Sequence, residues 1–301
     1  MPLCLIFSSN ILIQLPPVIK NAVFRQYSKL DQSLFSRLVR LGVPRIILER
    51  QGRCRPEIAS LFNWRYHTSE GVLGNLNNVS TDREYQLSNA GFVHTFQLID
   101  VLPFKGKGEH CPTPYYYQNL GEAEYVVAVY QYMRLLGYPR EKISILTTYN
   151  GQKELIQDIV NQRCKGASFG SPIISTVDQY QGQQNDYVLL SLVRTGSVGH
   201  LRDIRRLVVA MSRARLGLYI FCRQALFSGC QELSPVFSYL TKSRGTNLEL
   251  YVGESFPSSR NCADEVSKSS SHVVDDVTAM GVLVYQMVQQ ASRNVLSTHT
   301  Q

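Results

Sequence analysis

The chain has 301 residues, of which 44% are hydrophobic, and it carries a formal net charge of +8. This hydrophobic content supplies a packed core and argues against global disorder, and the length fits one large domain or two small ones. The basic excess favours a polyanionic partner such as nucleic acid or a nucleotide. The seven cysteines are scattered without a C-x-x-C pair, which fits reduced thiols better than a disulfide framework or a zinc site. No apolar run is long enough to cross a bilayer, which argues against a membrane partner.

The first part of the chain predicts short elements separated by loops. Residues 1–27 are apolar and interrupted by proline, and they lack the basic start of a secretory signal. The elements predicted after them are a helix over 28–41, a strand over 45–49, a helix over 56–66, a polar surface insertion over 67–91, a strand over 92–101 and a loop over 103–118.

From residue 120 onward, apolar strands alternate with amphipathic helices. The predicted elements are helix 120–136, strand 143–147, helix 152–160, strands 172–176 and 187–193, helix 203–215 and strand 218–222. This alternation is typical of the α/β class and predicts a parallel sheet with helices on both faces. Residues 248–252 add a possible edge strand. After residue 253 the composition turns to Ser, Asn and Asp, which predicts a less ordered C-terminal tail with one possible helix.

The segment from Ile204 to Arg215 predicts a helix with an apolar stripe on one side and arginines on the other. The stripe consists of Ile204, Leu207, Val208 and Met211, and the arginines roughly opposite it are Arg202, Arg206 and Arg213. Guanidinium groups are permanently charged and forked, which suits phosphate oxygens. The alternative for this segment alone is a solvated basic face.

Hydrogen-bonding residues follow the predicted strands. In open parallel sheets, ligands bind beyond the carboxyl ends of the strands. The segments at those ends are 51–56, 147–152 and 176–183, and each offers hydroxyls, amides, glycine or arginine. Any one of them could be an ordinary polar loop, but several at one edge of a sheet predict a site for phosphate and ribose.

Four segments, in chain order, resemble motifs of the superfamily 1 helicases. They resemble the tail of motif III and motifs IV, V and VI, and they are Gln14-Leu-Pro-Pro17, Gln51-Gly-Arg-Cys-Arg-Pro56, Thr176-Val-Asp-Gln-Tyr-Gln-Gly182 and Arg205-Arg-Leu-Val-Val-Ala-Met-Ser-Arg-Ala-Arg215. The stretch from about 14 to 253 resembles the second RecA-like domain of the Upf-like branch, which has a P-loop NTPase-like fold. Three further segments resemble the intron-binding RNA helicases of the spliceosome: Gln118–Tyr125, Ile145–Lys153 and Asp178–Tyr187.

The resemblance implies a domain organisation and a function. It implies a truncated stub over 1–27 that carries the end of motif III, a second RecA-like helicase domain over 28–253, and a C-terminal tail over 254–301. The implied function is that of the C-terminal motor domain of an ATP-dependent RNA helicase in pre-mRNA splicing, located in the nucleus. The implied partners are single-stranded intron RNA, spliceosome proteins and a first RecA-like domain.

The resemblance also implies roles for individual residues. Arg53 and Arg213 would be the catalytic arginines directed at the γ-phosphate, with Arg213 as the arginine finger. The ATP-binding residues would be Gln181, Gly182, Gln184 and Arg215. Alternatives from the residues themselves are a surface salt bridge for Arg53, a turn glycine at Gly182 and a buried ion pair for Arg215.

Three residues near strand ends are candidates for RNA contacts. Thr148 and Thr176 could bind phosphates of single-stranded RNA, and Tyr149 lies beside Thr148. The alternative for each threonine is a capping or strand-end hydroxyl. The tyrosines at 115–117 could stack bases, but surface or core aromatics are the better expectation there.

The sequence departs from the helicase pattern in several ways. Gln184 stands where many relatives have glutamate, and Gly52 where many have an aromatic residue. There is no G-x-x-x-x-G-K-[ST] loop, since Lys105-Gly-Lys-Gly108 does not fit it, and no acidic motif for magnesium. ATP and Mg²⁺ would therefore be held mainly by the first motor domain, and no metal ligands are expected here. A partial gene model, a truncated copy or a short isoform would explain this pattern. The alternatives for function are a non-catalytic RNA- or spliceosome-binding module and a related DNA helicase.

Overall fold

The computed structural model describes residues 6–8, 19, 21–28, 32–68, 71–165, 169–242, 244–264, 266 and 268–298. At its centre is a five-stranded parallel sheet in the order β11–β10–β12–β13–β7. The strands are β7 (Phe96–Asp100), β10 (Ile143–Thr147), β11 (Ile173–Thr176), β12 (Asn185–Ser191) and β13 (Ala214–Cys222). The predicted α/β fold with a parallel sheet is therefore confirmed.

The central strands are apolar because both faces of the sheet are buried. Along β12, Tyr187 and Leu189 belong to the core on one face, while Val188 and Leu190 belong to the core on the other. This alternation follows from the period of two in a strand, which points successive side chains to opposite faces. The Val and Leu side chains of β12 therefore contribute to two hydrophobic cores, one on each face of the sheet.

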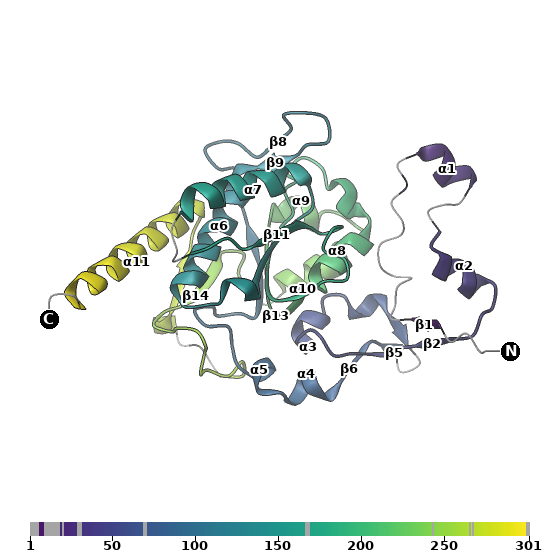
Figure 1. Ribbon diagram of the computed structural model, residues 1–301, viewed down its shortest axis with the longest axis horizontal. Coiled ribbons are helices and arrows are strands. Elements are labelled where there is room, and N and C mark those ends of the chain that lie inside the picture. Colours follow the sequence, from purple (N-terminus) through teal and green to yellow (C-terminus); the bar gives the residue numbers. More distant parts are fainter. Residues whose placement is uncertain are drawn as a thin grey trace.

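Helices cover both faces of the sheet (Figure 1). The core of one face includes α6 (Leu120–Leu135), α7 (Asn150–Arg163) and α11 (Val277–Thr298). The core of the other face includes α3 (Pro56–Ala59), α8 (Ile204–Met211), α9 (Gln224–Ser228) and α10 (Ser234–Thr241). No helix of the described residues is both long and apolar enough to span a membrane.

The N-terminal elements lie apart from the central sheet. They are β1 (Ile6–Ser8), α1 (Ala22–Tyr27), α2 (Leu34–Arg40) and β2 (Arg45–Ile47). The strand predicted over 45–49 pairs with β1, so its expected place in the main sheet is wrong. Figure 1 shows α1 and α2 at the opposite end of the molecule from α11. The motif III segment Gln14–Pro17 lies outside the described residues.

The segment predicted as a polar surface insertion contributes to the core. It contains β4 (His67–Thr68), β5 (Gly71–Val72), β6 (Gly74–Asn75), α4 (Asn77–Thr81) and α5 (Arg83–Gln86), and β6 pairs with β3 (Arg50–Gln51). Leu73, Val79 and Tyr85 are buried. Isolated apolar residues in a polar segment lack the periodicity that sequence patterns detect, so the prediction was wrong for them.

Short elements complete the connections. They are η2 (Asn63–Arg65), β8 (Glu109–His110), β9 (Gln118–Asn119), η3 (Arg140–Lys142), η4 (Gly199–Arg202) and η5 (Lys268–Ser270).

The predicted helix over 203–215 is shorter than expected. The side chain of Asp203 caps its start by accepting from Arg205 N, and α8 ends at Met211. Ala214 already pairs with Asn185 in β12, because the apolar run of β13 extends the strand back to that residue. Arg213 and Arg215 are therefore not on the helix, and the predicted arginine face does not exist as one surface.

The C-terminal segment is more ordered than its composition predicted. Its strand β15 (Ser271–Val274) pairs with β14 (Leu248–Tyr251), so residues 248–251 do not extend the central sheet. Val277, Met280 and Val284 of α11 are buried in the same core as α6.

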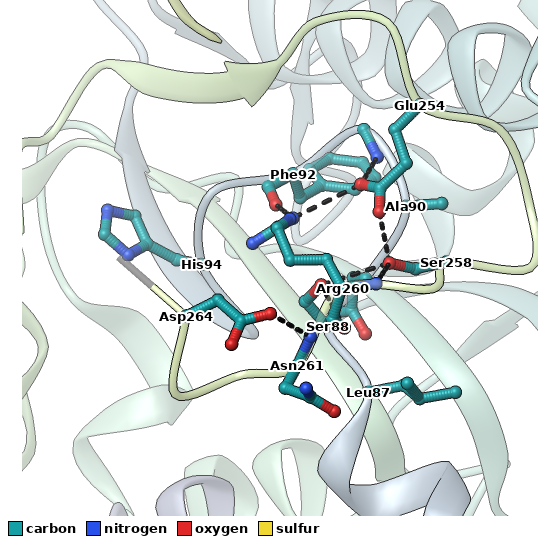
Figure 2. Close-up of polar contacts among 12 residues, drawn as sticks. Leu87, Ser88, Ala90, Phe92, His94, Glu254, Ser258, Arg260, Asn261 and Asp264 are labelled. Atoms are coloured by element: carbon teal, nitrogen blue, oxygen red, sulfur yellow. Dashed lines mark hydrogen bonds and ion pairs between the residues drawn. The ribbon is translucent and has the colours of Figure 1, made fainter. Parts of the chain in front are cut away.

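Polar contacts fasten the segment before β15 to the loop that precedes β7 (Figure 2). Arg260 Nη2 donates to the main-chain oxygen of Phe92 at 2.7 Å, and Ser88 N donates to the main-chain oxygen of Arg260 at 2.8 Å. Glu254 accepts from Gly91 N at 3.1 Å. Residues 254–264 therefore pack on the domain through both side-chain and main-chain hydrogen bonds.

Candidate functional site

The loop after β3 has a fixed main-chain shape. Gln51 Oε1 accepts hydrogen bonds from the main-chain N of Arg53 at 2.9 Å and of Cys54 at 2.8 Å, and Gln51 Nε2 donates to the oxygen of Cys54 at 2.8 Å. A Cβ atom at Gly52 would lie 2.8 Å from Leu76 Cδ1, so a larger residue would not fit without a shift of Leu76. This packing accounts for the glycine at position 52.

Arg53 connects this loop to two distant segments. Its Nε donates to Gln184 Oε1 at 2.5 Å, and its Nη1 donates to the main-chain oxygen of Ser212 at 3.1 Å. The main-chain oxygen of Arg53 accepts from Tyr85 Oη at 3.0 Å. The guanidinium group is therefore held between the residue before β12 and the residue after α8.

Arg213 is buried beside Arg53, with 1% of its surface exposed. Its Nε donates to Val209 O at 2.8 Å, its Nη1 to Gln183 O at 3.1 Å and its Nη2 to Ser212 Oγ at 2.8 Å. These bonds use three of the five N–H groups of an arginine. Burial, together with the positive charge of Arg53, lowers the pKa of Arg213 to about 10, so it stays charged at neutral pH.

The two guanidinium groups line a pocket of about 430 Å³. The other polar lining comes from Arg50, Gln51, Gln184 and Ser212, and no carboxylate lines the pocket. Among the residues that the structure describes, neither Arg53 nor Arg213 forms an ion pair. The paired positive charges of Arg53 and Arg213, with Arg50 also in the lining, create a site for an anion. We call this site the arginine pocket.

The arginine pocket lies at the opposite edge of the sheet from the one predicted. Gln184 directly precedes β12 and Arg213 directly precedes β13, so both lie at the amino ends of parallel strands. Thr148 and Thr176 lie at the carboxyl ends of β10 and β11. The expectation that all candidate residues gather at one carboxyl edge is therefore wrong, since the loops carry them to both edges.

The remaining residues predicted to bind ATP do not line this pocket. Gln181 and Gly182 are exposed in the turn between β11 and β12, and Gly182 has a φ of +86°, a conformation that favours glycine. Arg215 lies on β13 and forms ion pairs with Asp186 and Glu84. Burial lowers the pKa of Arg215, but the neighbouring Asp186 carboxylate outweighs this and the pKa lies above its usual range.

The three residues predicted to bind RNA already have partners within the chain. Thr148 Oγ1 donates to Leu192 O at 3.2 Å, and Thr176 Oγ1 accepts from Gln179 N at 3.4 Å. Tyr149 is buried, and its ring centroid lies 4.1 Å from that of His200. The structure thus places Tyr149 in the interior and not on a stacking surface.

Sequence reasoning missed a cluster at the carboxyl end of β12. Arg194 N donates to Leu192 O at 2.9 Å across Val193, whose φ is +74°. This is the rarer and strained form of the γ-turn, and a β-branched residue is disfavoured in it. Because Arg194 directly follows an apolar strand, the strand-end argument could have found it.

A buried carboxyl group supports this turn. Glu122 Oε2 accepts from Val193 N at 2.8 Å and from Ser191 Oγ at 2.6 Å, while Asn119 Nδ2 donates to Val193 O at 3.1 Å. Burial raises the pKa of Glu122 to about 8. The turn positions Arg194, whose guanidinium carbon lies 3.9 Å from the ring centroid of Tyr117.

No group of three or more His, Cys, Asp or Glu side chains in the described ranges has the arrangement of a metal site. The arginine pocket supplies donors for an anion and no carboxylate for a cation. Its residues therefore fit the phosphates of a nucleotide and not a magnesium ion.

A family model described as an AAA domain matches residues 30–225. The chain is 56% identical over 276 residues to the mouse protein named RNA helicase aquarius, an overlap of 91% of this chain and 18% of that protein. It is 34% identical over 237 residues to Pre-mRNA-splicing factor cwf11 of Schizosaccharomyces pombe, which is 78% of this chain and 18% of that protein. The mouse NFX1-type zinc finger-containing protein 1 is 36% identical over 199 residues, or 63% of this chain and 9% of that protein. The chain thus spans less than a fifth of the length of these relatives.

Proposed function

We propose, from the premise that the chain belongs to the AAA domain family of superfamily 1 helicases, that it is the second motor domain of an ATP-dependent RNA helicase in pre-mRNA splicing. The names of two of these relatives, an RNA helicase and a pre-mRNA-splicing factor, support this assignment. Single-stranded intron RNA and spliceosome proteins are the proposed partners, and the nucleus is the proposed location.

One observation carries the nucleotide part of the proposal. Arg53 and Arg213 share the arginine pocket, both contact Ser212, and neither forms an ion pair within the described residues. A guanidinium group that reaches the cleft between two motor domains stabilises charge on a transferring phosphoryl group. Three of the five N–H groups of Arg213 bond within the chain, and the other two can serve this purpose.

The cofactors proposed are ATP and Mg²⁺. The arginine pocket would contact the phosphates, and Gln184 would orient Arg53 toward them. The magnesium ligands and the phosphate loop would come from a first motor domain, which is proposed to pack against the arginine pocket. In this arrangement the present chain supplies positive charge and the partner domain supplies the metal site.

The experiment that tests the proposal is substitution of Arg213 in the complete helicase. Arg213→Lys keeps the charge but loses the forked geometry, and Arg213→Gln loses both. We expect both variants to reduce the kcat for RNA-stimulated ATP hydrolysis by about a thousandfold or more, with the affinity for a fluorescent ATP analogue nearly unchanged.

Two controls separate catalysis from folding. Arg202→Gln removes an exposed arginine that pairs with Glu232 outside the pocket, and it should leave kcat unchanged. Circular dichroism melting of each variant checks the fold, because Arg213 also bonds three buried acceptors. A folded Arg213→Gln variant with normal kcat would refute the proposal.

A further inference from the structure

A second pocket, of about 620 Å³, lies on the other side of the sheet from the arginine pocket. It is formed by the middle of α6, the first turns of α11 and the segment after β7 that begins at Val101. It shares no lining residue with the arginine pocket. The proposed nucleotide and RNA contacts do not use it. We call it the α6–α11 pocket.

Large apolar side chains at the α6–α11 pocket are exposed. The exposed fraction is 58% for Leu102, 51% for Val282 and 64% for Tyr285. All three line the pocket, so they form one apolar patch around a hollow. Apolar patches that surround a hollow are typical of ligand or protein binding sites, whereas single exposed apolar residues are not informative.

Gly281 keeps the pocket open. It lies within α11 and lines the pocket, and no atom lies within 4 Å of the position that a Cβ would occupy. Glycine weakens a helix interior relative to alanine. A side chain at this position would therefore extend into the pocket without meeting other described parts of the chain.

The pocket lining carries four carboxylates, a buried tyrosine hydroxyl and two basic side chains, Lys105 and Arg163. Tyr125 is 1% exposed and lines the pocket, and its hydroxyl has no hydrogen-bond partner among the described residues. Asp275 and Asp276 lie at the start of α11, where Asp276 Oδ1 accepts from Ala279 N at 2.8 Å. Within the described part of the chain neither aspartate forms an ion pair. The other two carboxylates of the lining are already paired, Asp100 with Arg223 and Glu124 with Arg163.

We propose that the α6–α11 pocket is a docking site for an extended segment of a partner protein that carries a lysine or arginine beside a bulky apolar side chain. The apolar side chain would fill the space over Gly281 and contact Val282 and Tyr285. The basic side chain would pair with Asp275. Charge complementarity favours a basic occupant, because the four carboxylates of the lining outnumber its two basic side chains, Lys105 and Arg163, although the whole chain has a net charge of +8.

The same charges disfavour RNA in this pocket. Asp275 and Asp276, which form no ion pair within the described residues, repel phosphate groups, and of the two basic side chains in the lining, Arg163 is already paired with Glu124. The partner chemistry is therefore that of a basic and apolar peptide, and RNA binding becomes an outcome that the experiment can distinguish.

The test uses a phage-displayed library of random peptides. The library is selected on the purified wild-type chain and counter-selected on Gly281→Leu, whose side chain fills the pocket. We expect enrichment of sequences in which lysine or arginine neighbours leucine, phenylalanine or tryptophan. A synthetic peptide of the enriched sequence should bind Gly281→Leu at least about tenfold more weakly than wild type by fluorescence polarisation.

Matched variants make the result specific. Gln289→Leu adds leucine to an exposed position of α11 outside the pocket and should bind the peptide like wild type. Asp275→Asn should weaken binding by roughly threefold to tenfold, with a smaller effect at high salt. Leucine favours a helix more than glycine, so Gly281→Leu should melt no lower than wild type.

Other outcomes overturn the proposal. Enrichment of acidic or uncharged sequences would contradict the charge argument, and a failure to enrich any sequence against Gly281→Leu would contradict the site itself. If Gly281→Leu weakened single-stranded RNA binding instead, the pocket would belong to the RNA surface. The variant Arg213→Gln should bind the peptide normally, which separates this site from the proposed motor function.

Discussion

Arg53 donates a hydrogen bond from its Nε to Gln184 Oε1 at 2.5 Å. The contact joins the loop after β3 to the residue that precedes β12, and it orients the guanidinium group within the arginine pocket. Gln184 is therefore a neutral acceptor. It leaves the full positive charge of Arg53 available to an anion, whereas a glutamate would neutralise part of it.

Replacement of Arg53 should reduce catalysis with little effect on folding. We expect Arg53→Gln in the complete helicase to lower the kcat for ATP hydrolysis by about a hundredfold or more, because the pocket loses one of two charges that would contact phosphate. Gln184→Glu should also lower kcat, since the new carboxylate would pair with Arg53. Steady-state ATPase assays with saturating RNA measure both effects. Equal activity of Arg53→Gln and Arg202→Gln would contradict the role of Arg53.

The stability of the domain should fall as the pH rises from about 5 to about 8. The pKa of Glu122 is raised by burial to about 8 in the folded chain, against 4.5 as its ordinary value. Between these values the folded state binds a proton that the unfolded state has lost, so the free energy of unfolding decreases with pH, by at most about 1.4 kcal/mol per pH unit. Urea unfolding at several pH values measures this slope. Glu122→Gln removes the titrating group, and an unchanged slope in that variant would assign the effect to other residues.

Arg215 should matter for stability and not for catalysis. Its ion pairs with Asp186 and Glu84 connect β13 to β12 and α5, and the Asp186 side chain is only 9% exposed. Removal of one partner leaves the other charge poorly solvated, so Arg215→Met should lower the free energy of unfolding by about 1–3 kcal/mol. The exposed pair of Arg202 with Glu232 provides the control, because Arg202→Met should change it by less than about 1 kcal/mol. A loss of kcat without a loss of stability would instead support a direct nucleotide contact by Arg215.

The threonines at the carboxyl ends of β10 and β11 provide a test for nucleic-acid binding. If Thr148 and Thr176 contact phosphates, Thr148→Val and Thr176→Val should each weaken binding of single-stranded RNA by about threefold to tenfold, independent of sequence. Fluorescence anisotropy with matched RNA and DNA oligonucleotides over a salt series measures the affinity and its salt dependence. Both hydroxyls already bond within the chain, so a change in melting temperature without a change in RNA affinity would show a structural role. Equal affinity for RNA and DNA would favour a related DNA helicase.

The sequence predicts the layered fold well because the signals for it are local. The mostly apolar segment from Tyr187 to Leu192 predicts a strand buried on both faces, and the spacing of apolar residues over 120–136 predicts a helix. The residue at which α8 ends cannot be predicted from such local signals. Residues 212–215 continue the helical pattern, but pairing of Ala214 with Asn185 converts them to a turn and a strand. Sequence periodicity indicates which side of a helix or strand is apolar. It does not indicate where pairing with a distant strand terminates a helix.

The geometry of the sites depends on contacts between distant residues, which one sequence does not reveal. The motif resemblance names Arg53 and Arg213, but it does not predict that both bond to Ser212 or that Arg213 is buried. It also does not predict that Glu122 supports a strained turn at Val193. Both arrangements join segments that lie tens of residues apart, and each follows from the order of the strands in the sheet.

The packing of α11 against α6 has a consequence for how this protein should be divided. The family match ends at residue 225, yet β14, β15 and α11 complete the core that includes Tyr125 and Val126 of α6. A fragment cut at the end of the family match would expose that apolar surface to water and should aggregate. The unit that folds is therefore larger than the segment matched by the family model, and the C-terminal residues belong to it.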